Sequence, residues 1–491
     1  MPAALLLVPA LLLALYRVTT ALHMFQLDSY SSARYMQWLR AKPIERLFPP
    51  PWHRDTVPAK KPLEYTSRAK RILHSARCLL ILIALLMAAA RPSLPLAAVS
   101  ALLLAYLAPT AVLAANQLLK PVQAHINRGF VASAKKKIRQ LHPTVIGVAG
   151  SYGKTSTKYF IDTLLSQRFR TLKTPGSVNT QLGVTRVIND TLTAAHEVFI
   201  VEMGAYQRGE VKDVAGVAPP TIAIITSIGP EHFERFLTME NIEDTNYEVI
   251  DPLPPSGLAV FNCENAHCRK LADRTKHVPV IRYSLSADDI WAEDIQHSVE
   301  GLQFTIVTNT GLRIPAATSL VGRHNVLNIL GAAAIALHLK LTPDQITAGI
   351  ALLKPAPNRL EVKKGLGGAI IIDDSYNSNP DGAAEALHVL SEFTTGKRVL
   401  VTPGMIELGV LQREKNEQLG FQASKACDIV VLVGPEQTRP IAEGLRRGGF
   451  PIQNIHTVKD LSEATAIFQR IIRAGDVILF ENDLPDLYNE K

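Results

Sequence analysis

Cysteine, aromatic residues and charged residues are all scarce in this chain of 491 residues. There are 4 cysteines, and aromatic residues make up 6% and charged residues 20% of the sequence. So few cysteines exclude a disulfide framework, and the cluster of Cys263, His267 and Cys268 lacks the second pair of ligands that a zinc site needs. A hydrophobic content of 47% excludes a disordered chain. We therefore expect a folded protein of a reducing compartment, large enough for about two to four domains.

The excess of basic over acidic residues is also small. Lysine and arginine number 52 and aspartate and glutamate 44, which gives a formal net charge of +8. Much of the basic excess lies beside apolar segments, as is typical of membrane-flanking loops rather than of a nucleic-acid-binding surface. We therefore expect the membrane as a partner and no nucleic acid.

Three apolar segments at the N-terminus have the length of membrane spans, for which a bilayer needs about 20 residues. They lie near residues 3–22, 74–90 and 94–118, and only Arg91-Pro92-Ser93 separates the last two. The first segment can instead be a signal peptide, and the other two a buried helical hairpin. The missing charged start and cleavage site favour an uncleaved anchor. The sequence thus predicts transmembrane helices in a membrane region at residues 1–118.

Loop charge predicts the orientation of these spans. Basic residues outnumber acidic ones between the first span and the hairpin, and basic residues follow again after the hairpin. Basic loops stay on the cytoplasmic side. We therefore expect a multi-pass protein of the cell membrane whose catalytic domains are cytoplasmic.

From Thr144 the pattern changes to strands that alternate with helices, which is typical of an α/β fold with a mostly parallel sheet. A strand at 144–149 runs into the loop GSYGKTS and then a helix at 157–166. Backbone N–H groups in such a loop point at one spot, Lys154 adds a cation for phosphates, and the Thr155 hydroxyl can bind Mg²⁺. Val148 stands where the full P-loop motif has glycine. The pattern predicts an ATP site formed by Gly150, Ser151, Tyr152, Gly153, Lys154, Thr155 and Ser156.

Two further strand ends lead to the same place. Glu202 ends one apolar run, and His232 follows the next apolar run along the chain. Ligands of open α/β sheets bind beyond the carboxyl ends of the strands. We therefore expect Thr155, Glu202 and His232 to form a Mg²⁺ site.

The C-terminal part reads as a second, smaller α/β domain. Short apolar strands at 369–373, 398–402, 429–433 and 476–480 alternate with helical stretches such as 382–392 and 412–425. We expect a central P-loop-type ATPase domain at 119–353 and, beyond a proline-rich linker, a Rossmann-like domain at 358–491.

Six ordered segments carry a resemblance to a known family: GSYGKTS (150–156), TPGSVNTQLGV (174–184), VEMGA (201–205), GPEHFERF (229–236), GRHNVLNILGAAAIAL (322–337) and NRL…IIDDSYNSNP (358–380). Through them the chain resembles the Mur ligase family, the ATP-dependent amide ligases of peptidoglycan synthesis, and most closely its MurF type, which adds D-alanyl-D-alanine. The likeness runs from about Thr144 to the end of the chain.

The resemblance implies roles for single residues, with Lys154, His232 and Arg359 as the catalytic side chains. Asn179 would lie close to the phosphates. Asn328 would contact adenine, Arg359 the phosphates and Asp374 the ribose. Because Arg359 and Asp374 lie beyond the linker, closure of the domains would complete the site.

The chain departs from the family at three places. Asn246 stands where the family has a carbamylated lysine, which would bridge a second Mg²⁺. An asparagine cannot carry the carbamate, so the second metal lacks this ligand. A KGSR-like segment is replaced by Phe480-Glu481-Asn482-Asp483. The apolar N-terminal region stands where the family has its UDP-sugar-binding domain.

The resemblance implies a membrane-tethered ligase that uses ATP and Mg²⁺. It would activate a cell-wall precursor carboxylate as an acyl phosphate and join an amino acid or a dipeptide such as D-Ala-D-Ala, releasing ADP and phosphate. A Mur-type ligase for a different or lipid-linked carboxylate is one alternative, and a non-catalytic ATP-binding membrane scaffold is another. The departures argue for a scaffold, and the retained residues argue against it: Lys154, Glu202, His232, Arg359 and Asp374.

Overall fold

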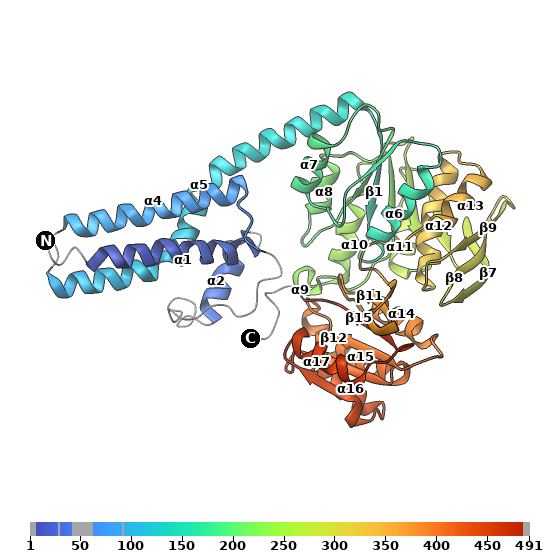
Figure 1. Cartoon of the computed structure of the whole chain (residues 1–491). Coiled ribbons are helices and arrows are strands. Elements are labelled where there is room, and N and C mark those ends of the chain that lie inside the picture. The colour runs from blue at the N-terminus through green and yellow to red at the C-terminus, as the bar shows by residue number, and fades with distance from the viewer. Residues whose placement is uncertain (1–5, 28–29, 42–61, 91–92, 485–491) are drawn as a thin grey trace. The chain divides into compact units, whose positions relative to one another are not determined.

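The computed structural model describes residues 6–27, 30–41, 62–90 and 93–484, and the chain divides into two compact units, a helical unit up to Gly129 and a larger unit from Phe130 (Figure 1). The predicted boundary at residue 118 falls inside one long helix, and the predicted boundary near 353–358 falls inside the larger unit. The proposed domain limits therefore stay predictions.

The described part of the helical unit consists of α1 (Leu7–Leu27), α2 (Ser32–Ala41), α4 (Ser67–Ala89) and the first part of α5 (Leu94–Leu141). Thr66 begins α4, since its hydroxyl accepts the Ala69 N–H at 3.1 Å. Phe25, Tyr35 and Leu80 belong to the buried apolar cluster that joins these helices. α1, α4 and α5 are long and apolar enough to cross a membrane by length and composition. They overlap the three predicted spans, of which residues 3–5 lie outside the described residues, and α5 continues past the predicted end at residue 118.

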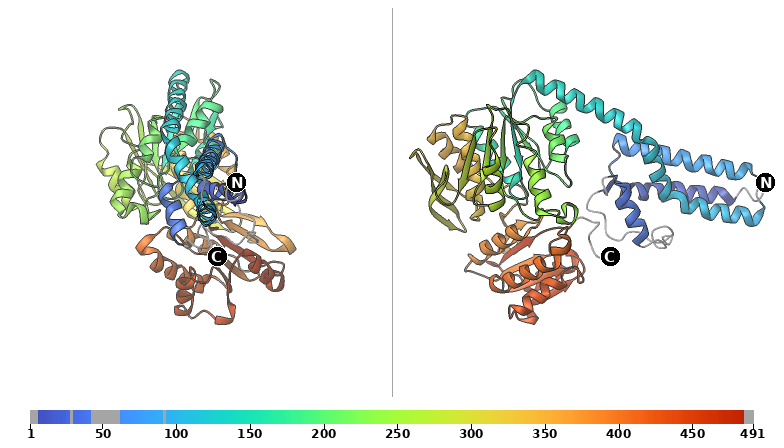
Figure 2. Two further views of the ribbon diagram at one scale, coloured as in Figure 1. Left: turned by 90° about the vertical axis from the view of Figure 1, so that its left-hand side faces the viewer. Right: turned by 180° about the vertical axis from the view of Figure 1, so that it is seen from behind.

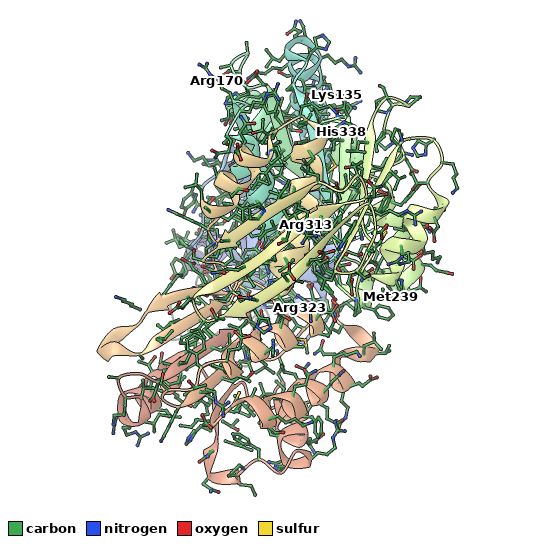
Figure 3. The ribbon with its side chains drawn as sticks, turned by 90° about the vertical axis from the view of Figure 1, so that its right-hand side faces the viewer. Lys135, Arg170, Met239, Arg313, Arg323 and His338 are labelled. Carbon is green, nitrogen blue, oxygen red and sulfur yellow. The ribbon has the colours of Figure 1, made fainter. Side chains whose placement is uncertain are left out.

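A nine-stranded sheet forms the centre of the larger unit, in the order β2-β3-β1-β4-β5-β6-β7-β8-β9. The pairs from β2 to β7 are parallel, and β8 and β9 are added as antiparallel strands. Arg313, labelled on the strands nearest the viewer in Figure 3, is exposed on β9 and pairs with Glu293 of β7 at 2.7 Å. The strands are β1 (Thr144–Ala149), β2 (Thr171–Lys173), β3 (Val198–Glu202), β4 (Ile222–Ile225), β5 (Leu258–Asn262), β6 (Val280–Ser284), β7 (Ile290–Ser298), β8 (Gly301–Thr308) and β9 (Arg313–Thr318).

Helices cover both faces of this sheet, because its parallel strands are apolar on both sides (Figure 1). One face packs on α6 (Lys154–Leu165), α12 (His324–His338) and α13 (Pro343–Ala351). The other packs on the end of α5 and on α7 (Gln181–Asp190), α8 (Glu210–Ala215), α10 (Met239–Tyr247) and α11 (Ala266–Arg274). A short helix, α9 (Phe233–Phe236), follows β4. The carboxyl ends of the strands are therefore where we expect a ligand-binding site.

The C-terminal part has a six-stranded sheet in the order β10-β11-β15-β12-β13-β14, parallel except for the β10–β11 pair. Its strands are β10 (Glu361–Lys364), β11 (Ile370–Asp374), β12 (Arg398–Thr402), β13 (Ile429–Val433), β14 (Ile455–Val458) and β15 (Val477–Glu481). Its helices are α14 (Pro380–Ser391), α15 (Gln412–Ala426), α16 (Arg439–Arg447) and α17 (Leu461–Ile471), which can be followed from two sides in Figure 2. α14, α15 and α16 pack on one face and α17 on the other, as in a doubly wound fold.

The predicted mostly parallel α/β fold is confirmed. The expected C-terminal strands match β11, β12, β13 and β15 within one residue at each end. The helix expected at 157–166 begins earlier, at Lys154, because Gly153 takes a φ of 78° and turns the chain directly into α6.

Candidate active site

The loop between β1 and α6 lies at the carboxyl end of the central strands. β1 pairs with β3 on one side and β4 on the other, with Val148 opposite Glu202. Gly150 and Gly153 have φ angles of 133° and 78°, which favour glycine. A Cβ atom on Gly153 would lie 2.7 Å from Asn328 Oδ1. The loop therefore needs glycine at both positions.

The first three N–H groups of this loop already have partners. Gly150 donates to Asn246 Oδ1 at 2.8 Å, and Ser151 and Tyr152 donate to the Ser227 carbonyl at 2.6 and 3.4 Å. No side chain caps the start of α6, and the first N–H groups of a helix have no partner within it. The part of the predicted loop that can receive an anion is therefore the first turn of α6, from Lys154 to Ser156.

Lys154 is held by a carboxylate in this structure. Its Nζ atom donates to Glu231 Oε2 at 2.9 Å and to the Ser151 carbonyl at 2.8 Å, and 11% of its side chain is exposed. A phosphate oxygen accepts from an ammonium as a carboxylate oxygen does. Glu231 was not predicted as a site residue, although it lies in the segment that supplied His232.

Several side chains of the site donate hydrogen bonds to Glu202. Its Oε2 atom accepts from the Thr155 hydroxyl at 3.0 Å, and its Oε1 atom accepts from Asn179 Nδ2 at 3.2 Å. The side chain is buried. Thr155 and Glu202 were expected to share a Mg²⁺ site with His232, and Asn179 to lie close to the phosphates. The structure brings Thr155, Asn179 and Glu202 together, and their oxygen atoms suit a hard cation such as Mg²⁺.

The fully buried ammonium group of Lys158 also contacts Glu202. Lys158 Nζ donates to Glu202 Oε2 at 2.8 Å and to the Gly176 carbonyl at 2.5 Å. Burial lowers the pKa of Lys158, and the charge of Glu202 opposes that shift. Lys158 was not predicted as a site residue. The sequence does contain a signal for it: Lys158 lies four residues after Lys154, and residues four apart share one face of a helix.

His232 is tied to the C-terminal part of the unit. Its Nδ1 atom is hydrogen-bonded to Glu407, which also accepts from Arg235 at 3.1 Å. Its Nε2 atom lies 3.8 Å from Glu231 Oε1, and its ring centroid lies 4.3 Å from that of Tyr206. The three predicted metal ligands thus fall into two groups. Thr155 lies with Glu202, whereas His232 lies with Glu231 and Glu407.

Asn328 lies against the loop from the α12 side. Its Oδ1 atom accepts from the Thr157 hydroxyl at 3.2 Å, and its Nδ2 atom donates to Asn325 at 3.2 Å. Both ends of the buried amide therefore have partners within the central part, close to Gly153.

The two predicted residues beyond the linker lie near each other. The Arg359 guanidinium lies 4.3 Å from the ring centroid of Tyr376, whose hydroxyl contacts Ser177 of the central part. Asp374 accepts the Leu360 N–H at 3.0 Å. The structure thus brings Arg359 and Asp374 to the side of the C-terminal sheet that meets the central part.

A buried acid, Glu481, accompanies Asp374. Burial and the charge of Asp374 raise the pKa of Glu481 well above its usual range. Burial also raises the pKa of Asp374. Ser378 donates to Glu481 at 2.6 Å. Glu481 belongs to the segment that departs from the family pattern, and it was not predicted as a site residue.

Asn246 anchors the phosphate loop. While its Oδ1 atom accepts from Gly150, its Nδ2 atom donates to the Ile242 carbonyl at 2.9 Å, and the side chain is buried. This asparagine therefore has a structural task at the place where the family resemblance expects a modified lysine.

Two curated relatives carry the same name. A UDP-N-acetylmuramoyl-tripeptide–D-alanyl-D-alanine ligase of Escherichia coli is 34% identical over 304 residues, which span 61% of this chain and 66% of that protein. An enzyme of the same name from Bacillus subtilis is 30% identical over 350 residues, 71% of this chain and 75% of that protein.

These comparisons contradict the predicted location in the cell membrane as a multi-pass protein with cytoplasmic catalytic domains. The relatives of this name are soluble cytoplasmic enzymes. Only length and composition mark α1, α4 and α5 as candidate spans. Long apolar helices also pack on one another, as the cluster containing Leu22, Leu80 and Val112 does. The expectation was wrong because apolar length and basic flanking loops were taken as sufficient evidence of membrane spans.

Family models and a solved structure agree with the fold. The Mur ligase middle domain matches residues 148–336, and the Mur ligase glutamate ligase domain matches residues 358–481. The MurF ligase of Thermotoga maritima in complex with ADP superposes with a TM-score of 0.64 at 26% identity, covering 72% of this chain and 80% of that one. The chain therefore belongs to the Mur ligase family and is an enzyme of the Mur ligase type.

Proposed function

We propose that the chain is a MurF-type ligase, which uses ATP to join D-alanyl-D-alanine to a UDP-N-acetylmuramoyl-tripeptide in peptidoglycan synthesis. The observation that carries this proposal is the contact between Thr155 and Glu202, 3.0 Å long, beside the uncapped start of α6 and Lys154. The names of the relatives in E. coli and B. subtilis support the choice of substrates.

The ATP phosphates bind at the start of α6 in this proposal. Lys154 exchanges Glu231 for a phosphate oxygen, and the N–H groups of the first helical turn donate to the same group. Arg359 adds a second cation from the C-terminal part. Asp374 accepts from the ribose, and Asn328 lies on the adenine side of the loop.

Thr155, Glu202 and His232 are the proposed Mg²⁺ ligands. Mg²⁺ at this place would neutralise charge on the transferred phosphoryl group. A metal-binding histidine usually hydrogen-bonds through its other ring nitrogen to a carboxylate, which fixes the ring. The bond from His232 Nδ1 to Glu407 fits this arrangement and leaves Nε2 for the ion.

The chemistry follows from the inertness of a carboxylate toward an amine. The precursor carboxylate attacks the γ-phosphate of ATP, which gives an acyl phosphate and ADP, and the amine of the dipeptide then displaces phosphate. Lys154 and Arg359 stabilise the charge on the phosphoryl group, the main catalytic task in such transfers.

Product analysis tests the proposal. The purified protein receives ATP, Mg²⁺ and UDP-N-acetylmuramoyl-tripeptide, with either D-alanyl-D-alanine or single amino acids. We expect ADP release and a product extended by two alanines with the dipeptide alone. Stimulation by a single amino acid instead, or turnover only with another carboxylate, would overturn the assignment of substrates.

A further inference from the structure

The helical unit carries positive charge that its own carboxylates do not balance. Among its described residues, 6–27, 30–41, 62–90 and 93–129, Glu64 is the single carboxylate. The basic residues in the same ranges are Arg17, Arg34, Arg40, Arg68, Lys70, Arg71, Arg77, Lys120 and Arg128. Like charges gathered on a small unit repel one another, and an anion relieves that repulsion.

Three of these cations converge on one pocket. A pocket of about 190 Å³ between α4 and α5 is lined by Arg68, Arg71 and Lys120, and none of the residues that line it is acidic. Arg68 and Arg71 lie three apart on α4, so they share one face of that helix. A volume several times the roughly 30 Å³ that a water occupies has room for a phosphate or diphosphate group.

Amide side chains orient the two guanidinium groups. Arg71 donates to Gln123 at 2.7 Å, and Gln123 donates to Asn127 at 2.7 Å. Arg68 lies 3.5 Å from the oxygen of buried Asn116. A guanidinium has five N–H donors, and one amide oxygen takes a single one of them. The pocket therefore keeps donors for a ligand.

The electrostatic state of Arg68 agrees with an anion site. Its guanidinium lies 4.1 Å from the ring centroid of Tyr30. Burial lowers the pKa of Arg68, and the neighbouring positive charge of Arg71 lowers it further. An anion between the two arginines would reverse the second effect.

We propose that this pocket binds the phosphate groups of a ligand, at a site distinct from the proposed ATP site. The planar fork of arginine matches two phosphate oxygens, and paired arginines can hold a diphosphate. The phosphate can belong to a soluble phosphorylated compound or to a lipid headgroup, because both present the same oxygen atoms.

Titration calorimetry of the full-length protein with inorganic pyrophosphate tests this site. The titrations are made in a Lys154→Ala background, which removes the proposed phosphate cation of the larger unit. We expect binding that Arg71→Gln weakens about tenfold or more, since it removes a charge-assisted hydrogen bond. Lys70→Gln is the matched control, because the exposed Lys70 neighbours Arg71 but does not line the pocket.

A second variant and a second probe complete the test. Lys120→Gln changes an exposed side chain on the other helix, so its effect on binding does not depend on refolding of α4. Vesicles of phosphatidylcholine, with and without phosphatidic acid, identify a lipid source if binding needs the phosphatidic acid and Arg71. Failure of both probes, or equal weakening by Lys70→Gln, would overturn the proposal.

Discussion

Lys158 and Glu202 form an ion pair inside the central part of the enzyme, with Nζ 2.8 Å from Oε2 and side chains that are 0% and 2% exposed. Removing one partner of a buried pair leaves an uncompensated charge. This pair therefore couples the stability of the central sheet to the position of the carboxylate that we propose as a Mg²⁺ ligand.

Lys158→Met is expected to reduce the free energy of unfolding by about 3–5 kcal/mol, because Glu202 then stays buried without its cation. The double variant Lys158→Met/Glu202→Gln is expected to recover much of this loss. Chemical denaturation measures both. Arg313→Met serves as the control, since the side chains of the Arg313–Glu293 pair are 52% and 39% exposed and the pair should contribute about 0–1 kcal/mol. Equal losses in the two single variants would contradict this account of Lys158.

Asn246→Ala is expected to destabilise the central part by about 1–3 kcal/mol, because the buried Gly150 N–H loses its acceptor. Asn246→Asp keeps an acceptor for Gly150, but it buries a carboxylate and sets one of its oxygens against the Ile242 carbonyl, so it should cost at least as much as Asn246→Ala. Nucleotide affinity, measured by ADP titration, should fall in the order of these stabilities. Unchanged stability of Asn246→Ala would show that the asparagine does not hold the loop.

Glu407→Gln is expected to lower kcat/KM by about tenfold or more, because a charged hydrogen bond to His232 becomes a neutral one. As a positioning residue, Glu407 should leave ADP affinity unchanged while the Mg²⁺ concentration needed for half-maximal rate rises. The exposed Glu414 of α15 gives the matched control, Glu414→Gln. An unchanged Mg²⁺ requirement would contradict the role assigned to Glu407.

The raised pKa of Glu481 predicts how stability depends on pH. The folded protein holds this proton above the pH at which an unfolded glutamate releases it, so the folded state binds more protons and its stability falls as the pH rises above the unfolded value near 4.5. Thermal unfolding across this range should show a steeper loss for the parent than for Glu481→Gln, by at most about 1.4 kcal/mol per pH unit. Parallel curves would mean that Glu481 titrates normally.

The sequence predicts the parts of the site that depend on one strand end or one turn. We expected Glu202 and Thr155 to lie close together because parallel strands end at one edge of the sheet and the glycine loop follows the central strand, and the Thr155 hydroxyl lies 3.0 Å from the Glu202 carboxylate. Glu231 and Glu407, the partners of Lys154 and His232, were not predicted. Glu231 is 77 residues from Lys154 in the sequence, and Glu407 is 175 residues from His232. Only the packed fold brings such distant groups together.

The location was mispredicted for a related reason. Hydropathy reports that a segment avoids water, and both a bilayer and a neighbouring helix satisfy that requirement. In the folded unit α1, α4 and α5 pack on one another through residues such as Val18, Leu80 and Leu104, and this packing buries 28–33% of their apolar segments.

Lys154→Ala tests the central claim most directly. ADP formation is measured with ATP, UDP-N-acetylmuramoyl-tripeptide and D-alanyl-D-alanine in the parent, in Lys154→Ala and in Lys276→Ala, which removes an exposed lysine far along the chain from the loop. Because Lys154 is the proposed cation of the phosphate site, we expect its loss to abolish turnover while the thermal unfolding midpoint is retained, and Lys276→Ala to match the parent. Comparable ADP formation by Lys154→Ala and the parent would contradict the account.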